Sequence, residues 1–280
     1  MSSSPHRLTE GQRRALVDFL RTRRARLTPA DVGLPAGGGR RTAGLRREEV
    51  AVLAGVSVTW YTWLEQGRPI NPSDAVLRAI ARTLRLTDDE TSHLLKLAVP
   101  GPATNGWTEP PPELQALVDS QHPAPAVLLD PRWDLLGWNR SAEALWTFSA
   151  VPPADRNLAW LTFHPVLRTV LVDWEGHARR VVGELRASSA ALADDPRFAA
   201  VLARLRATYP EVEAWWSTGE VRTPTGSRKV IDHPEVGRLV MDQVVLRPAS
   251  APDLHLSVLV PERGGDTADR LTALLAAAHR

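Results

Sequence analysis

One stretch, residues 45–68, constrains the fold of this chain more than any other part of it. Three of its apolar residues recur at helical spacing and are expected to face a core: Val50, Leu53 and Ala54. Gly55 follows as a helix stop, because the residue after a helix favours a positive φ that glycine adopts without strain. Ser57 fits the N-cap of a second helix, since its hydroxyl can accept from an orphan backbone N–H. The stretch therefore predicts two short helices joined by a tight turn.

The second of these helices places Tyr61 and Leu64 inward and ends at Gly67. This is the pattern of a helix-turn-helix, whose second helix lies in the major groove of DNA. A purely structural pair of helices can imitate parts of it. The glycine–valine corner, the serine cap and the terminal Leu-Glu-Gln-Gly are harder to imitate together. The sequence therefore predicts double-stranded DNA as a partner.

The charge is divided unevenly along the chain. Residues 1–100 hold 16 Arg and Lys against 10 Asp and Glu, a net of +6, whereas residues 101–280 hold 18 against 22, a net of −4. The positive half is thus the half with the helix-turn-helix, as counterion release from DNA phosphates favours. Basic charge alone also serves solubility, so it only supports the prediction.

The outward face of the second helix carries the residues expected nearest the bases: Ser57, Val58, Thr59, Thr62 and Trp63. Threonine and valine side chains can touch base edges and thymine methyls. Trp63 could instead pack on the following helix. Five arginines flank the two helices and are expected at phosphates, where they position rather than specify: Arg40, Arg41, Arg46, Arg47 and Arg68. The first two could equally belong to a linker. The arginines of residues 9–24 could form a solvated face or contact the DNA backbone.

Five helices are expected in the first 100 residues, followed by proline- and glycine-rich sequence that ends in Pro110-Pro111-Pro112. Polyproline stretches are stiff and extended. We therefore expect a DNA-binding domain over residues 1–100, a linker over 101–112 and a second domain over 113–280. The second domain is expected to have strands at both ends, a short one at 221–222 among them, and helices between. The expected fold class is α+β, with an all-α domain followed by a mostly antiparallel sheet.

Composition and missing motifs exclude several functional classes of protein. The chain has no cysteine, which excludes disulfides and thiolate metal sites. It shows neither a signal peptide nor the ~20 apolar residues of a membrane span, so a cytoplasmic protein is expected. No serine elbow, phosphate loop or paired histidine motif accompanies His164 or His233. We therefore expect neither an enzyme nor a cofactor nor a metal site, and His233 is expected to fix a turn.

Two ordered sets of motifs resemble known families. The first 100 residues resemble the Xre family, the phage-repressor type of helix-turn-helix, although Trp63 stands where a polar residue is common. The later part is similar to the ligand-binding domain of MmyB-like regulators, a PAS-like fold, although Gly219 stands where a histidine is common. That likeness rests on WDLLGWN at 133–139, DWE at 173–175, DDPRF at 194–198 and HPEVG at 233–237, with Asn157, Leu158, Phe163, Leu185 and Arg186 between them.

The resemblance implies a one-component transcription factor whose second domain binds a small, fatty-acid-like molecule between sheet and helices. Tryptophans could line such an apolar cavity, and an arginine would suit a carboxylate. The expected contacts are Trp133, Trp138, Asn139, Trp146, Phe163, Trp174 and Arg186, each of which could also be plain core, an N-cap or a surface arginine. Alternatively, this domain is a ligand-free dimerisation or protein-interaction module. A homodimer is expected, because repressor-type domains commonly read two half-sites.

Overall fold

The computed structural model describes residues 8–35, 44–98, 106–222 and 226–277. These residues divide into two compact units. The first unit takes its residues from 1–103, 183–200 and 210–223, and the second unit from 104–182, 201–209 and 224–280. The linker expected at 101–112 stays a prediction, because residues 99–105 lie outside the described part of the chain.

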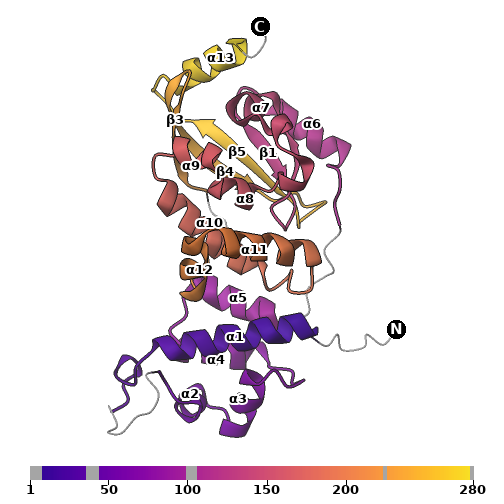
Figure 1. Cartoon of the computed structure of the whole chain (residues 1–280). Helices are drawn as coiled ribbons and strands as arrows, with labels where there is room; N and C mark the ends of the chain where they lie inside the picture. The colour runs from indigo at the N-terminus through magenta and orange to yellow at the C-terminus, as the bar shows by residue number, and fades with distance from the viewer. Residues whose placement is uncertain (1–7, 36–43, 99–105, 223–225, 278–280) are drawn as a thin grey trace. The chain divides into compact units, whose positions relative to one another are not determined.

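Five helices occupy the N-terminal part of the first unit, as the sequence predicts (Figure 1). They are α1 (Glu10–Arg26), α2 (Arg47–Ala54), α3 (Val58–Glu65), α4 (Asp74–Thr83) and α5 (Asp88–Ala98), with a 3-10 turn, η1 (Ala30–Val32), after α1. Side-chain caps set their starts. Thr9 accepts from the backbone of Gln12, Ser57 from Trp60, and Ser73 from Val76. Each cap satisfies one of the N–H groups that the first turn leaves without an intrahelical partner.

The core of the first unit lies among these helices. Its large buried side chains are Leu16, Phe19, Leu20, Val50, Tyr61, Leu64, Leu77, Ile80, Leu94 and Leu97. The prediction that Leu53 faces this core is wrong, since Leu53 is 40% exposed while Ala51 is fully buried. Helix α2 turns its two alanines, Ala51 and Ala54, toward the core, and these small residues let it lie close to α4.

Two later segments complete the first unit. They are the end of α10 (Trp174–Ser188) with the start of α11 (Pro196–Thr208), and the segment that begins with α12 (Pro210–Ser217). Ala190 and Val221 are buried in the same core as the N-terminal helices. The strand expected at 221–222 is therefore absent: Val221 is 5% exposed in this core, and the N–H of Arg222 donates to the carbonyl oxygen of Gly183 at 3.1 Å.

The second unit is built on one antiparallel sheet of five strands in the order β2-β1-β5-β4-β3. Its strands are β1 (Ala126–Leu129), β2 (Leu135–Trp138), β3 (Arg228–His233), β4 (Gly237–Leu246) and β5 (His255–Pro261). Strands come from both ends of the unit with helices between, so the expected α+β fold class, with a mostly antiparallel sheet, is confirmed. His233 also behaves as expected, because its Nδ1 accepts from the N–H of Glu235 in the β3–β4 turn.

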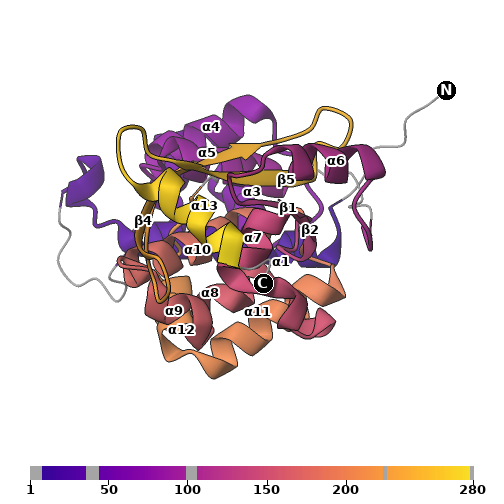
Figure 2. The ribbon, with the colours of Figure 1, turned by 90° about the horizontal axis from the view of Figure 1, so that it is seen from above.

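The helices of the second unit cover the sheet. They are α6 (Pro112–Ser120), α7 (Arg140–Trp146), α8 (Leu158–Phe163), α9 (Pro165–Val170), the first half of α10, the end of α11, and α13 (Thr267–Ala277), with 3-10 turns η2 (Phe148–Ala150) and η3 (Pro153–Asp155). Helix α13 lies beside α7 and β4 (Figure 2). Leu145 of α7 and Leu271 of α13 pack there on Ile231 and Met241 of the sheet. Helix α6 packs through Leu114 and Val118 with the apolar side chains of β1 and β5 that point the other way.

Strand register decides which residues share a face, because side chains alternate along a strand. Lys229 pairs with Met241, Gln243 with Leu259, and Val127 with Ser257. These paired residues therefore lie on one face of the sheet, the face covered by α7 and α13. That face carries three polar side chains, Lys229, Gln243 and Ser257, among its aliphatic ones.

The Asn139 side chain makes four hydrogen bonds to the backbone, and these allow a test of what stabilises the second unit. Its Oδ1 accepts from the N–H groups of Ala142 (2.9 Å) and Ala126 (3.1 Å), and its Nδ2 donates to the carbonyls of Ala124 (2.8 Å) and Val118 (3.3 Å). We predict that Asn139→Ala lowers the free energy of unfolding by about 3 kcal/mol, because it removes an N-cap and leaves buried backbone groups unpaired. Urea unfolding followed by circular dichroism measures the loss.

The matched control is Asn71→Ala at an exposed turn of the first unit. It should change stability by no more than about 0.5 kcal/mol. Equal effects of the two substitutions would contradict the role assigned to Asn139.

Candidate nucleic-acid interface and ligand cavity

The turn between α2 and α3 has the geometry that the sequence predicts. Gly55 ends α2 at φ +69°, in the left-handed region. The next N–H, that of Val56, donates to the carbonyl of Ala51 at 3.0 Å. Helix α3 then begins at Val58, and it buries Tyr61 and Leu64 completely or nearly so.

The opposite side of α3 is open to solvent. Ser57, Val58, Thr59 and Trp63 are exposed and Thr62 is half-buried. Trp63 is 39% exposed and lies outside the hydrophobic core of the unit. The guanidinium of Arg68 stands 5.7 Å from its ring centre. The residues predicted to face bases therefore share one accessible helix face, with an arginine beside it.

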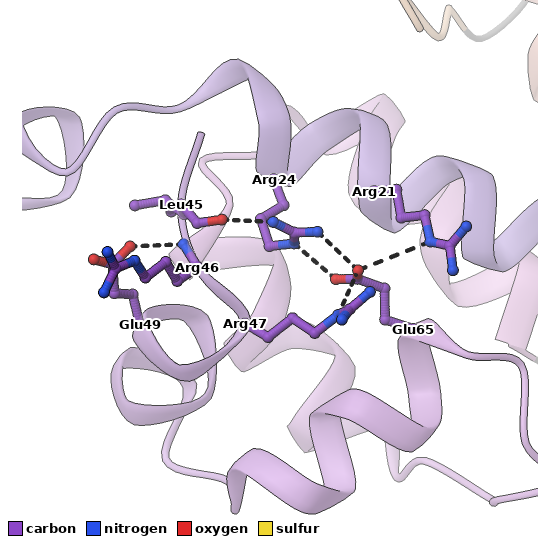
Figure 3. Close-up of polar contacts among 7 residues, drawn as sticks. All are labelled: Arg21, Arg24, Leu45, Arg46, Arg47, Glu49 and Glu65. Carbon is purple, nitrogen blue, oxygen red and sulfur yellow. Dashed lines mark hydrogen bonds and ion pairs between the residues drawn. The ribbon is translucent and has the colours of Figure 1, made fainter. Parts of the chain in front are cut away.

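A buried carboxylate, Glu65, closes the last turn of α3 (Figure 3). It is fully buried and accepts a bidentate pair of hydrogen bonds from Arg24, each 2.8 Å long. Arg47 Nε donates to the same group at 2.9 Å, and Arg21 Nε lies 3.9 Å away. Arg24 also donates to the carbonyl of Leu45 at 2.6 Å. Through Glu65, the ends of α1 and α3 and the start of α2 are held together.

The arginines around Glu65 lower the pKa of its carboxyl group. Burial alone would raise the pKa of Glu65, but hydrogen bonds and charge from Arg24, and then from Arg47, outweigh burial and hold the pKa below its ordinary value. The carboxylate is therefore ionised at neutral pH. Helix α3 is anchored by a charged group whose partners lie on two other helices.

The arginines predicted at phosphates differ in how the protein uses them. Arg47 is 40% exposed and already bound to Glu65, whereas Arg46 is 48% exposed and lies 3.8 Å from Glu48. Arg68 is exposed beside Trp63. Arg40 and Arg41 lie outside the described residues. On α1, the solvated-face interpretation is wrong at Arg23, which is 2% exposed and 2.8 Å from Glu90, and at Arg24, which is 16% exposed and bound to Glu65.

The second unit contains a wide cavity of about 350 Å³. It is lined mainly by apolar side chains, among them Trp146, Phe148, Trp160, Leu161, Val166 and Leu167, with Asp155 and His164 as its ionisable groups. The guanidinium of Arg204 lies 3.6 Å from the ring centre of Trp160 and pairs with Asp155. The volume falls within the range of small-molecule sites.

A narrow cavity of about 60 Å³ shares Trp146, Phe148 and Leu167 with the wide cavity. Its polar wall consists of Lys229, Gln243, Ser257 and His177. The first three come from the inner face of the sheet and His177 comes from α10. Gln243 Nε2 donates to Ser257 Oγ at 2.9 Å. The two cavities together have one apolar end and one polar end.

Of the seven residues predicted to contact a ligand, most lie away from these two cavities. Trp146 lines both cavities, and the other six line neither of the two. Asn139 caps α7, and Trp138 Nε1 donates to Glu143 at 2.7 Å. Trp174 Nε1 donates to the carbonyl of Thr162. Phe163 is fully buried against Trp174 and Tyr209, Trp133 is 9% exposed, and Arg186 stacks over Trp216 at 4.8 Å in the first unit.

Sequence reasoning missed His177 and Lys229. The two are 52 positions apart, and neither belongs to a motif. One signal was present: Lys229 alternates with Ile231 in a strand that has an aliphatic inner face, so period-two spacing alone would have turned this lysine inward.

These two sites define a class of protein, a helix-turn-helix DNA-binding regulator that carries a second domain with an apolar cavity. Comparison with protein families agrees. A helix-turn-helix domain profile matches residues 15–94, and the profile of the MmyB-like transcription regulator ligand binding domain matches residues 110–275. The chain therefore belongs to the MmyB-like transcription regulator family. No curated protein matches it. No helix in the described ranges is both long and apolar enough to cross a membrane.

We predict that Glu65→Met lowers the stability of the first unit by roughly 3 kcal/mol at pH 7, because Arg24, 16% exposed, loses its counter-ion. Since the pKa of Glu65 is lowered on folding, its contribution is complete above the ordinary value of 4.5 and is lost as the pH falls through the lowered pKa. Urea unfolding at pH 7 and pH 3 should therefore show a difference between wild type and variant that shrinks in acid.

Glu48→Met is the control, since the Glu48 side chain is 63% exposed and its contact with Arg46 is loose. It should behave like the wild type at both pH values. A Glu65→Met deficit of the same size at pH 3 as at pH 7 would contradict the charge-based account.

Proposed function

We propose that this protein binds specific DNA sequences through the exposed face of α3, and that a small, mainly apolar molecule in the cavities of its second domain modulates that binding. The observation that carries the proposal is that one chain combines an accessible face on α3 with an apolar cavity of about 350 Å³. The family supports the two general roles. The contacts with particular bases and the type of ligand are part of this proposal.

For DNA, support comes from the exposed side chains of α3. Thr59 and Thr62 offer hydroxyl and methyl groups to base edges, and Val58 offers a surface for a thymine methyl. Arg68 lies beside Trp63 of this face and Arg46 is exposed at the start of α2, and both are assigned to phosphates. We assign Arg47 a mainly structural role with a lesser phosphate contact, because its Nε is bound to Glu65.

For the ligand, support comes from the lining. The wide cavity is bounded by aromatic and aliphatic side chains, so it suits a hydrocarbon chain or another apolar body. The fatty-acid-like molecule expected from the sequence fits this description. We place its apolar part against Trp146, Leu161 and Leu167.

One observation favours a second role for the same domain. Val244, Leu246 and Val260 share the outer face of β4 and β5 and are 41%, 50% and 42% exposed. A row of exposed aliphatic side chains on neighbouring strands is typical of a protein-protein contact. We propose a homodimer that reads two half-sites. Dimerisation by this face and ligand binding in the cavity are compatible.

The DNA prediction begins with an operator selected from a random duplex library with the full-length protein. Arg46→Ala and Arg68→Ala should each weaken binding to all duplexes by a similar factor. Each should also lower the slope of log affinity against log salt by about one, since one phosphate contact is lost. Fluorescence anisotropy over a range of salt concentrations measures both effects.

Thr59→Ala is the contrasting variant, expected to change preference at one base position by ~1–3 kcal/mol with the salt slope unchanged. Arg238→Ala, 60% exposed in the second unit, is the control and should leave DNA binding at the wild-type level. If Arg46→Ala and Arg68→Ala matched this control, the phosphate assignment would be wrong.

The ligand prediction uses Leu167, which lines both cavities. Leu167→Trp should fill the space that they share and reduce binding of tetradecanoate at least tenfold, as measured by native mass spectrometry. Val172→Trp adds the same side chain at a position that is 51% exposed, and it should bind tetradecanoate like the wild type. Equal binding by wild type and Leu167→Trp would remove the cavity as the ligand site.

A further inference from the structure

The first unit contains a polar cavity of about 340 Å³ that the proposed function does not use. It is lined by the end of α1, by η1 and by the turn between α4 and α5, all of which belong to the first unit. Its ionisable side chains are Arg23, Arg26, Arg85, Asp31 and Glu90, and we call this cavity the arginine pocket. The volume is within the range of small-molecule sites.

Arg23 is a buried guanidinium in this pocket. Its side chain is 2% exposed, its Nη1 lies 2.8 Å from Oε1 of Glu90, and its guanidinium stands 5.1 Å from the ring centre of Phe19. Glu90 supplies a counter-charge, but Arg23 Nε, Nη1 and Nη2 make no hydrogen bond within the described part of the chain. A buried donor without an acceptor costs free energy. The pocket therefore presents donors that an added acceptor would satisfy.

The two carboxylates of the pocket have donors of their own. Asp31 Oδ2 accepts from the N–H of Thr28 at 2.6 Å and from its hydroxyl at 2.7 Å. Glu90 Oε2 accepts from the N–H of Thr87 at 3.0 Å. Three arginines and two carboxylates give the lining a net charge of +1. The surplus charge of the pocket is positive, so it favours an anion.

The other two arginines of the pocket reach solvent. Arg26 is 55% exposed and its contact with Glu90 is loose at 3.8 Å. Arg85 is exposed and follows the end of α4 at φ +50°, in the left-handed region. Glycine is the usual residue at such a helix end, so the backbone does not require an arginine there. Both side chains are long and can close over an anion held by Arg23.

The arginine pocket lies away from the end of the recognition helix. Arg23 and Arg26 are three positions apart, which places them on one side of α1, and both meet Glu90. Arg24, which binds Glu65 of α3, points about 160° away from Arg26 around the helix axis at 3.6 residues per turn. The exposed DNA-binding face of α3 and the pocket are therefore served by different sides of α1.

We propose that the arginine pocket binds the phosphate group of a small molecule, with Arg23 as the buried donor and Arg26 and Arg85 closing over the group. Arginine suits phosphate because its planar fork of donors matches two phosphate oxygens at once. Leu27 and Leu84 add apolar surface to the lining, on which the rest of the molecule can lie. The inference adds a site in the DNA-binding unit and does not depend on a ligand in the second unit.

The test uses the full-length protein in a phosphate-free buffer and three probes: ribose 5-phosphate, inorganic phosphate and ribose. Isothermal titration calorimetry measures their affinities. Ribose 5-phosphate should bind at least tenfold more tightly than ribose, which lacks the charged group. Inorganic phosphate that binds as tightly as ribose 5-phosphate would identify the free ion as the ligand, and weaker binding would identify a phosphate ester. Either result supports a phosphate site.

Arg85→Gly is the most informative variant, because glycine fits the left-handed backbone and the fold is retained. It should weaken binding of ribose 5-phosphate about tenfold, as loss of a charge-assisted contact predicts. Arg26→Gln should have a similar effect. Arg23→Lys keeps a charge beside Glu90 but loses the fork, and it should weaken binding by at least as much. Circular dichroism checks that each variant is folded.

Arg78→Gln on α4 is the matched control, since Arg78 is 53% exposed, close to the 55% of Arg26, and lies outside the pocket lining. It should bind ribose 5-phosphate like the wild type.

Three results would each overturn the proposal. The first is a wild type that binds neither phosphate probe, which would leave Arg23 and Glu90 as a structural pair. The second is wild-type affinity in both Arg85→Gly and Arg26→Gln. The third is displacement of ribose 5-phosphate by duplex DNA, which would assign these arginines to the DNA backbone.

Discussion

The first unit depends on the fully buried carboxylate of Glu65. It receives two hydrogen bonds from Arg24 on α1 and one from Arg47 on α2 while it closes the last turn of α3. Without these donors, an ionised carboxylate would not remain in a protein interior. The orientation of the recognition helix is therefore set by charge as well as by the packing of Tyr61 and Leu64. An arginine whose sequence position suggests a DNA contact has, first of all, a structural partner.

Local patterns carried much of the prediction. The turn at Gly55, the cap at Ser57 and the five N-terminal helices follow from rules that act within a few residues, and the structure confirms them. Contacts between distant positions could not be predicted in this way. Glu65 meets Arg24 across 41 positions and Lys229 meets His177 across 52. The role of each of these four residues depends on its partner, and the sequence does not show which residue that partner is.

The misplaced strand at 221–222 has the same origin. A valine followed by a polar residue fits strand alternation, but Val221 packs in a helical core with residues of α1 to α5. Period-two spacing over two residues carries little information, and long-range packing decides the outcome. The first unit thus includes residues beyond position 180, which the sequence assigned to the second domain. The boundary between the two units falls inside helix α10, which contributes residues to each of them.

The inner face of the sheet carries a few polar groups in an otherwise apolar cavity lining. Its cavity lining is aliphatic or aromatic except at Lys229, Gln243 and Ser257 on the strands and at His177 on the helix opposite. A purely apolar lining would accept any hydrocarbon of suitable size, because the hydrophobic effect has no direction. A buried ammonium discriminates by charge, and its present acceptor is the one polar group of this lining that belongs to α10. The charged group of this lining therefore meets a neutral acceptor on the helix opposite, and burial of both makes their hydrogen bond costly to leave unmade.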